Sequence, residues 1–204
     1  MRGTIVGLFC SAASTFACAA TFTFPVDHSA TDHGQPLYVS DQTLISTIPS
    51  LKGTARRLLT CINPMFIPTS GTIEFAPVVT GDHLAQAKIL NCQLKTPETL
   101  TCSDEEATGR PVVFDNESSE SFALAPGTKM DEALEVFRAF RGSKAEYADE
   151  KAQPWIKGMP LRRIAREGAH YIVSFSDCGC SNNQVVEQRA GRFVVVKTRN
   201  GICI

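Results

Sequence analysis

Six cysteines follow the first twenty residues of this 204-residue chain, and cysteine sulfur can form disulfides, bind metals or take part in redox exchange. An even set of cysteines in an exported chain favours a disulfide framework, because disulfides persist in oxidising compartments. Zinc is the alternative, but the Cys-x2-Cys spacing typical of zinc sites occurs nowhere in the sequence. We therefore predict three disulfides among Cys61, Cys92, Cys102, Cys178, Cys180 and Cys203.

Two of these cysteines are expected to face each other in a hairpin. Residues 87–94 and 100–102 flank a short Lys-Thr-Pro-Glu-Thr segment, which indicates two antiparallel strands joined by a turn. This pairing places Cys92 opposite Cys102, close to the turn. A bond that closes so short a loop stabilises a fold by about 3 kcal/mol or slightly less in the loop-entropy account.

The other two bonds involve the C-terminal cysteines. Cys178 and Cys180 flank a single glycine, and a direct bond between them would close a strained ring. The predicted strands bring Cys203 to the same edge of a sheet, so we expect Cys203 to bond one of this pair and Cys61 to bond the other. Redox exchange is the alternative for the pair, but the acidic Asp177 beside it disfavours the thiolate that exchange requires.

Histidines and carboxylates provide the other candidate chemistry. Asp27-His28 and Asp32-His33 repeat at a spacing that could hold a divalent ion, but a flexible segment offers no preorganised site. The motifs of serine hydrolases, zinc peptidases and phosphate-binding loops are absent. We therefore predict neither a cofactor nor a metal site, and the sequence leaves any catalytic residue unknown.

Positive charge gathers at the C-terminal end of the chain. Residues 98–150 carry 13 acidic and 5 basic side chains, whereas residues 151–204 carry 3 acidic and 9 basic ones. The formal net charge of -1 conceals this division and argues against strong attraction to nucleic acid. The basic end either binds an anionic envelope component or another protein, or neutralises the acidic middle segment within the fold. The arginines of the first interpretation are Arg162, Arg163, Arg166, Arg189 and Arg192.

The first twenty residues have the pattern of a secretory signal peptide. Met1-Arg2 provides a positive start, an apolar stretch follows, and small residues close the segment. Cleavage after Ala19 or Ala20 is expected, and a lipid anchor at Cys18 is the alternative. The apolar stretch is far shorter than the roughly 20 residues that span a bilayer, and no later stretch approaches that length, so no transmembrane helix is predicted. The expected location is the periplasm or the extracellular space.

The elements that would position these residues indicate a single domain. Residues 21–40 have few periodic apolar positions, which predicts an exposed N-terminal arm. Apolar side chains that recur every three or four residues predict an amphipathic helix over about 129–141, capped by Thr128. Alternating runs over about 161–198 predict a C-terminal antiparallel sheet. The sequence thus predicts one disulfide-stabilised α+β domain over residues 41–204.

The function predicted from these features is binding. We expect an exported, disulfide-stabilised binding protein, inhibitor-like or adhesive and without catalytic activity, whose ligand the sequence does not specify. The alternative is an exported hydrolase whose catalytic groups come from separated positions in the chain.

Overall fold

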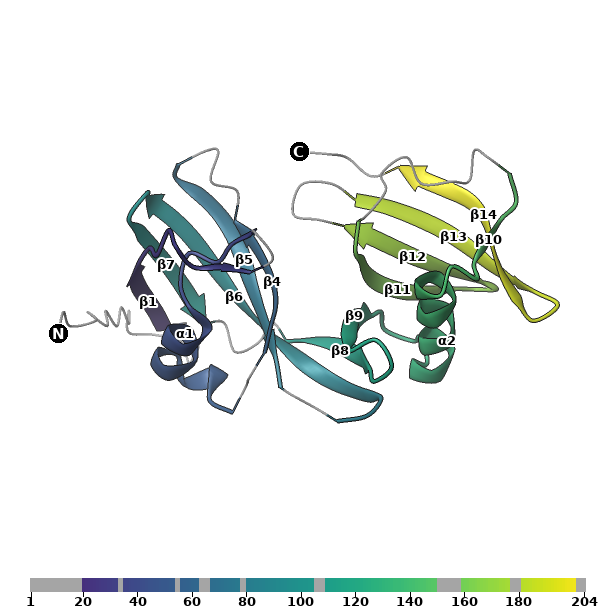
Figure 1. The fold of residues 1–204 in the computed structure, drawn as a ribbon, viewed down its shortest axis with the longest axis horizontal. Helices are drawn as coiled ribbons and strands as arrows, with labels where there is room; N and C mark the ends of the chain where they lie inside the picture. Colours follow the sequence, from purple (N-terminus) through teal and green to yellow (C-terminus); the bar gives the residue numbers. More distant parts are fainter. Residues whose placement is uncertain are drawn as a thin grey trace, which may run out of the picture. The chain divides into compact units, whose positions relative to one another are not determined.

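The computed structural model describes residues 20–32, 35–53, 56–62, 67–77, 80–104, 109–149, 159–176 and 181–200. Strand makes up 58% of the structure and helix 15%, so the predicted α+β class is wrong and the fold is mainly β. Twelve strands form a mixed sheet, and two α-helices accompany them in the described residues. The chain divides into two compact units where the sequence predicted one domain (Figure 1).

The first unit is an antiparallel sheet with a short helix. Its strands follow the order β4-β5-β6-β7-β1, and every neighbouring pair is antiparallel. A separate two-stranded sheet pairs β2 (Thr31–Asp32) with β3 (Gln35–Pro36). The remaining elements are β1 (Ala20–Pro25), α1 (Asp41–Thr47), a 3-10 turn (Pro49–Leu51), β4 (Arg56–Ile62), β5 (Thr69–Ala76), β6 (His83–Thr96) and β7 (Thr99–Asp104).

The segment predicted as an exposed arm is part of this sheet. β1 pairs with β7 along its whole length, and Phe22 and Phe24 are only 5% and 3% exposed. Side chains alternate between the two faces of a strand, so Thr-Phe-Thr-Phe sends both phenylalanines to the core. Tyr38 and Val39, at the far end of the segment, are buried as well. The arm prediction failed because four alternating residues are a short signal beside several turn-forming ones.

A hydrophobic core lies on one face of the first sheet. The region from α1 to the 3-10 turn contributes Leu44, Ile48 and Leu51, all fully buried. Ser40 caps α1 by accepting a hydrogen bond from the Thr43 backbone N–H at 3.3 Å. The sheet contributes Phe22, Phe24, Ile62, Ile73, Phe75, Leu90, Cys92, Leu94, Leu100 and Cys102 to the same cluster.

The second unit is a sheet with one helix on it. Its strands follow the order β8-β9-β11-β12-β13-β14-β10, and β11 to β14 form an antiparallel meander, which confirms the predicted C-terminal sheet. β9 pairs with β11, and β10 with β14, in parallel. The elements are β8 (Arg110–Asp115), β9 (Glu120–Leu124), α2 (Met130–Arg141), β10 (Glu146–Tyr147), β11 (Leu161–Glu167), β12 (His170–Ser176), β13 (Ser181–Arg189) and β14 (Arg192–Asn200).

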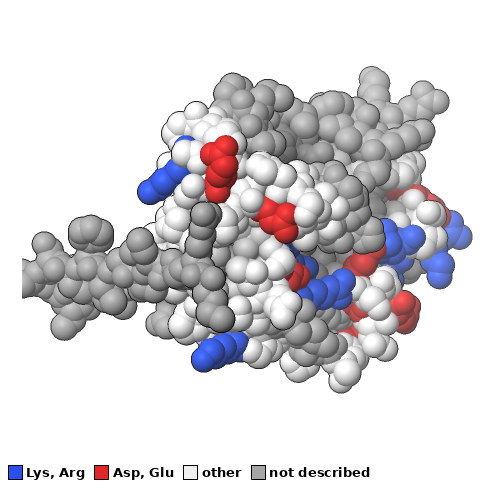
Figure 2. All heavy atoms as spheres, turned by 60° about the vertical axis from the view of Figure 1, so that its left-hand side comes forward, with Lys and Arg blue, Asp and Glu red and all other residues white. Residues whose placement is uncertain are grey.

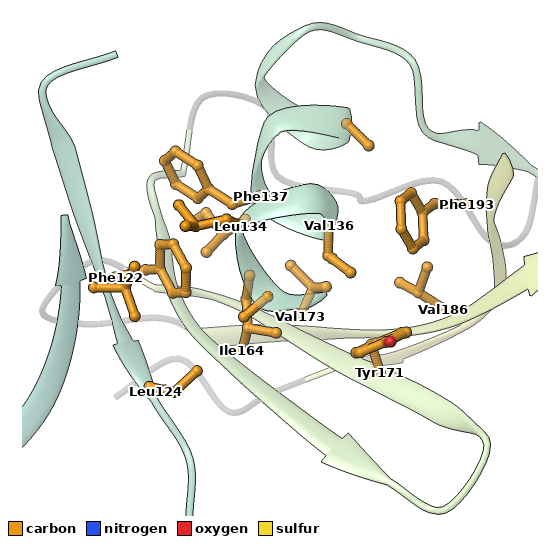
Figure 3. Packing of buried hydrophobic residues seen from close by; sticks show 14 of the residues in the cluster. Phe122, Leu124, Leu134, Val136, Phe137, Ile164, Tyr171, Val173, Val186 and Phe193 are labelled. Carbon is orange, nitrogen blue, oxygen red and sulfur yellow. The ribbon is translucent and has the colours of Figure 1, made fainter. Parts of the chain in front are cut away.

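Helix α2 confirms the predicted amphipathic helix. Its buried residues include Leu134, Val136 and Phe137, which lie over the sheet in Figure 3. Phe137 stacks on Phe122 of β9 with ring centroids 4.8 Å apart. The predicted cap is wrong, because Thr128 Oγ1 instead accepts a hydrogen bond from the Arg166 backbone N–H at 2.9 Å and Lys129 begins the helix without a side-chain cap.

The disulfide prediction is confirmed where the structure describes both partners. Cys92 and Cys102 are opposite each other on β6 and β7 and are bonded. Cys61 on β4 is disulfide-bonded too. The other predicted cysteines, residues 1–19 of the predicted signal peptide and the alternative anchor Cys18 lie outside the described residues. No helix in the described part of the chain is long and apolar enough to cross a membrane.

Candidate functional site

The arginines predicted to bind an anion are largely neutralised within the second unit. Three of them form ion pairs with glutamates: Arg166 with Glu132, Arg189 with Glu187 at 2.7 Å, and Arg192 with Glu146 at 3.0 Å. Arg162 donates to the Ser176 carbonyl at 3.3 Å, and Arg163 is exposed on β11. Two of the three carboxylates, Glu132 and Glu146, belong to the acidic middle segment. This arrangement favours neutralisation within the fold over a free basic face.

Arg166 illustrates this neutralisation. Its guanidinium and the Tyr171 hydroxyl both donate to the Glu132 carboxylate, which joins α2 to β11 and β12. Hydrogen bonds from Arg166 and then from Lys129 lower the pKa of Glu132, and the bond to Glu132 raises the pKa of Arg166. Burial is the main reason that the pKa of Tyr171 is raised. The group fixes the helix on the sheet and leaves Arg166 little capacity for an anion.

A second group of charges surrounds Arg138 on α2. Its guanidinium lies 2.9 Å from Asp82, 2.7 Å from Asp115 and 3.5 Å from Glu117. Burial opposes ionisation of Asp115, but hydrogen bonds from Ser118 and Arg138 outweigh it and lower the pKa of Asp115. These bonds tie α2 to the β8–β9 hairpin and to Asp82, which belongs to the same unit, so we assign the group a structural role.

A hollow of about 690 Å³ lies between the C-terminal part of α2 and the turn between β13 and β14. Arg192 and Lys144 line it, but so do the carboxylates of Glu135 and Glu146. A hollow lined by both signs does not select an anion by charge. Its other lining residues are Arg138, Ala139, Ser143, Ala145, Gly191 and Phe193.

The histidines do not form a metal centre in the part of the chain that is described. No three His, Cys, Asp or Glu side chains there are arranged so that they could hold a metal ion, and His28 is exposed in a turn after β1. His33, from the predicted Asp-His repeat, lies outside the described residues. His170 bonds Glu187 at 3.1 Å, and hydrogen bonds from Arg189 and His170 lower the pKa of that carboxyl.

The outer face of the first sheet carries two rows of uncharged polar side chains, which we call the polar rows. One row is Thr21, Ser103, Asn91 and Thr72, one residue from each of β1, β7, β6 and β5. Neighbouring strands lie about 4.8 Å apart, and the two rows lie about 6.7 Å apart because side chains on one face recur every second residue. The second row is Thr23, Thr101, Gln93 and Ser70.

The disulfide lies directly behind the polar rows. Cys92 separates Asn91 from Gln93 on β6, and Cys102 separates Thr101 from Ser103 on β7. Both cysteines belong to the buried core, at 3% and 0% exposed. The bond therefore holds the two central strands in register and fixes the spacing of the polar residues in front of it.

The polar rows retain capacity for hydrogen bonds to a ligand. Within the described residues, the side chains of the eight make two weak contacts, between the Thr23 and Thr101 hydroxyls at 3.5 Å and from Ser103 to the Asn91 carbonyl at 3.3 Å. The side-chain amides of Asn91 and Gln93 make no hydrogen bond to that part of the protein, and each offers donors and an acceptor. All eight side chains are exposed or half-buried.

The polar rows border a shallow cavity of about 380 Å³. Among the described residues that line it, Lys95 is the one charged side chain, so this part of the surface is close to neutral. On the face that Figure 2 shows, Lys, Arg, Asp and Glu are scattered among a larger number of other described residues, drawn in white. Gly71 also lines the cavity, and a Cβ there would meet the Cys61 carbonyl oxygen at 1.9 Å, so this position requires glycine.

Sequence reasoning did not find the polar rows. Their local signal is the alternation of polar with buried residues in Thr21–Phe24, Asn91–Leu94 and Thr101–Ser103. That alternation predicts strands, but it does not say which strands are neighbours. No family model, no curated protein and no solved structure matches this chain.

Proposed function

We propose that this protein is an exported, non-catalytic binding protein that holds neutral, hydroxyl-rich chains, such as polysaccharides or the glycans of a surface, on the polar rows. The observation that carries the proposal is the set of eight uncharged hydrogen-bonding side chains arranged in register over four strands. Hydroxyls and carboxamides both donate and accept, as sugar hydroxyls do. A face without opposed charges suits a neutral ligand better than an anionic one.

Weak binding at each position is part of this proposal. Solvent-exposed hydrogen bonds contribute only about 0.5–1.5 kcal/mol each, because each one replaces a bond to water. The polar rows carry no aromatic side chain on which a sugar ring could stack. Retention of a polymer would therefore depend on contacts repeated along the chain, which is typical of adhesive proteins.

Export is supported by the signal-like first twenty residues and by the disulfide of the first unit. β1 begins at Ala20, so cleavage after Ala19 would leave the whole strand in the mature protein, and cleavage after Ala20 would remove one residue. Either product keeps Thr21 and Thr23, the contributions of β1 to the polar rows.

The test is retention on immobilised polysaccharides. Dextran, mannan and a neutral β-glucan are the neutral probes, and heparin is the anionic one. The exported protein should be retained on at least one neutral polymer, and the double variant Asn91→Ala/Gln93→Ala should lose most of that retention. The double variant Gln42→Ala/Gln188→Ala removes two exposed carboxamides elsewhere and should behave as the wild type. Retention on heparin alone, or equal retention of both variants, would overturn the proposal.

A further inference from the structure

In the part of the chain that the structure describes, β1 is an edge strand with one open side. It stands at the end of the strand order, and its pairing partner among the described residues is β7. Figure 1 shows β1 on the outer side of β7. The backbone groups on the other side of β1 are therefore available to a further strand.

The pattern of hydrogen bonds identifies those open groups. Val26 N–H donates to the Glu98 carbonyl at 2.9 Å, one position beyond the pair of Pro25 and Thr99. Hydrogen-bonded and non-hydrogen-bonded residue pairs alternate along antiparallel strands. The backbone groups of Phe24 and Phe22 therefore form hydrogen bonds with β7, as the N–H of Val26 does. The backbone N–H and C=O groups of Thr21 and Thr23 consequently point toward the open edge.

The spacing of the two disulfide-bonded cysteines independently supports the same alternation of hydrogen-bonded pairs. The Cα atoms of Cys92 and Cys102 lie 4.0 Å apart, close to the short spacing of a non-bonded pair. If this pair is non-bonded, Cys102 directs its backbone groups away from β6 and toward Phe22 of β1. Both observations therefore leave Thr21 and Thr23 facing outward.

β1 ends in Pro25, but its first five residues lack the features that usually protect an open edge. Charges, bulges and prolines block the addition of a further strand, but residues 20–24 contain none of these and pair with β7 without a register shift. The edge strand β4, in contrast, begins with Arg56 and Arg57 and contains a register shift. Alternating Thr and Phe also has high strand propensity.

We propose that two copies of this chain join through antiparallel pairing of β1 with β1. With the twofold axis at Phe22, Thr21 of each copy lies opposite Thr23 of the other, and the two pairs form four backbone hydrogen bonds. No like charges oppose each other, because the strand is uncharged. A second copy fits this edge better than an unrelated strand does, because a strand paired antiparallel with itself is self-complementary.

Such pairing would extend the polar rows. Thr21 ends one row and Thr23 ends the other, so each row of one copy would continue into a row of the second. Two continuous rows of eight residues would result, and the longer face would compensate for weak individual contacts. This consequence rests on the proposed function, whereas the dimer itself does not.

Sedimentation of the exported full chain over a range of concentrations tests the dimer. The wild type should sediment as a dimer that dissociates on dilution. Thr23→Pro removes an outward N–H, and Thr21→Glu/Thr23→Glu places carboxylates across the axis. Both variants should weaken association by about tenfold or more. Ser70→Glu/Thr72→Glu adds the same charges on the same face, away from the edge, and should dimerise as the wild type.

Each outcome distinguishes the dimer from the proposed function. A wild type that stays monomeric, or edge variants that dimerise normally, would overturn the dimer. Dimeric protein without retention on neutral polysaccharides would count against the proposed function alone. Edge variants that fold, as judged by an unchanged unfolding midpoint, should be monomeric, whereas the control variant should remain dimeric.

Discussion

Cys92 and Cys102 lie opposite each other on β6 and β7, with their Cα atoms 4.0 Å apart. They are on the buried side of this strand pair, and its other side carries Asn91 and Gln93 of the polar rows. The most readily predicted covalent feature of the chain therefore lies against its candidate binding face. A bond in this place stabilises the first unit and preserves the register that aligns the polar residues.

The variant Cys92→Ala/Cys102→Ala is expected to lower the free energy of unfolding by about 2–3 kcal/mol, because the bond restricts the unfolded chain. Urea unfolding monitored by circular dichroism measures this loss. Retention on neutral polysaccharides should also fall, since β6 and β7 lose a constraint behind Asn91 and Gln93. An unchanged unfolding midpoint would contradict the stabilising role.

Non-reducing peptide mapping is expected to recover the peptides of Cys92 and Cys102 as one linked product. The same map tests the pairing predicted from the sequence for Cys61, Cys178, Cys180 and Cys203. We expect Cys61 to be linked to Cys178 or Cys180, and Cys203 to the other. A link between Cys61 and Cys203 would show that this part of the prediction is wrong.

Asp115→Asn is expected to destabilise the second unit by about 1–3 kcal/mol at neutral pH, because hydrogen bonds from Ser118 and Arg138 to the carboxylate are weakened. The pKa of Asp115 is lowered by folding, so the folded state binds its proton less readily than the unfolded chain does. This contribution is complete above the ordinary Asp pKa of about 3.9 and is lost as pH falls through the lowered value.

Urea unfolding from about pH 6 to about pH 2 measures this effect, and the difference between the wild type and Asp115→Asn should shrink as pH falls. Glu117→Gln is the matched control, since Glu117 lies 3.5 Å from the same arginine but is 70% exposed. The free energy of unfolding that Glu117→Gln loses should stay below about 1 kcal/mol. A difference that grows toward acid would contradict the assignment.

Arg163→Glu and Arg192→Glu are expected to leave retention on neutral polysaccharides unchanged at low and at high ionic strength. Arg163 is exposed on β11 and Arg192 is bonded to Glu146, and neither belongs to the polar rows. Binding through a basic face would instead weaken with salt and with each charge reversal. A large, salt-dependent loss would favour the anionic partner that the sequence suggested.

Sequence patterns correctly predicted the elements that form between residues close together in the chain. Helix α2 follows from its apolar periodicity, and the Cys92–Cys102 hairpin follows from two short strands around one turn. The C-terminal meander is similar, since its strands are sequential neighbours joined by turns at Gly168 and Gly191.

Features that depend on distant segments could not be found in this way. β1 pairs with β7 across about eighty residues, and only that pairing sets Thr21 beside Ser103. The Thr128 hydroxyl accepts a bond from Arg166 rather than capping α2, and no pattern near Thr128 indicates this competition. The ion pairs of Arg166 and Arg192 are of the same kind, because Glu132 and Glu146 reach these arginines from elsewhere in the chain.

Nuclear magnetic resonance of the side-chain amides tests the central claim most directly. The protein is titrated with a soluble oligosaccharide of the neutral polysaccharide that retains it. We expect the carboxamide signals of Asn91 and Gln93 to shift in a saturable way, while those of the exposed Gln42 and Gln188 do not shift. Shifts that leave Asn91 and Gln93 unaffected, or that gather around Arg189 and Arg192, would contradict it.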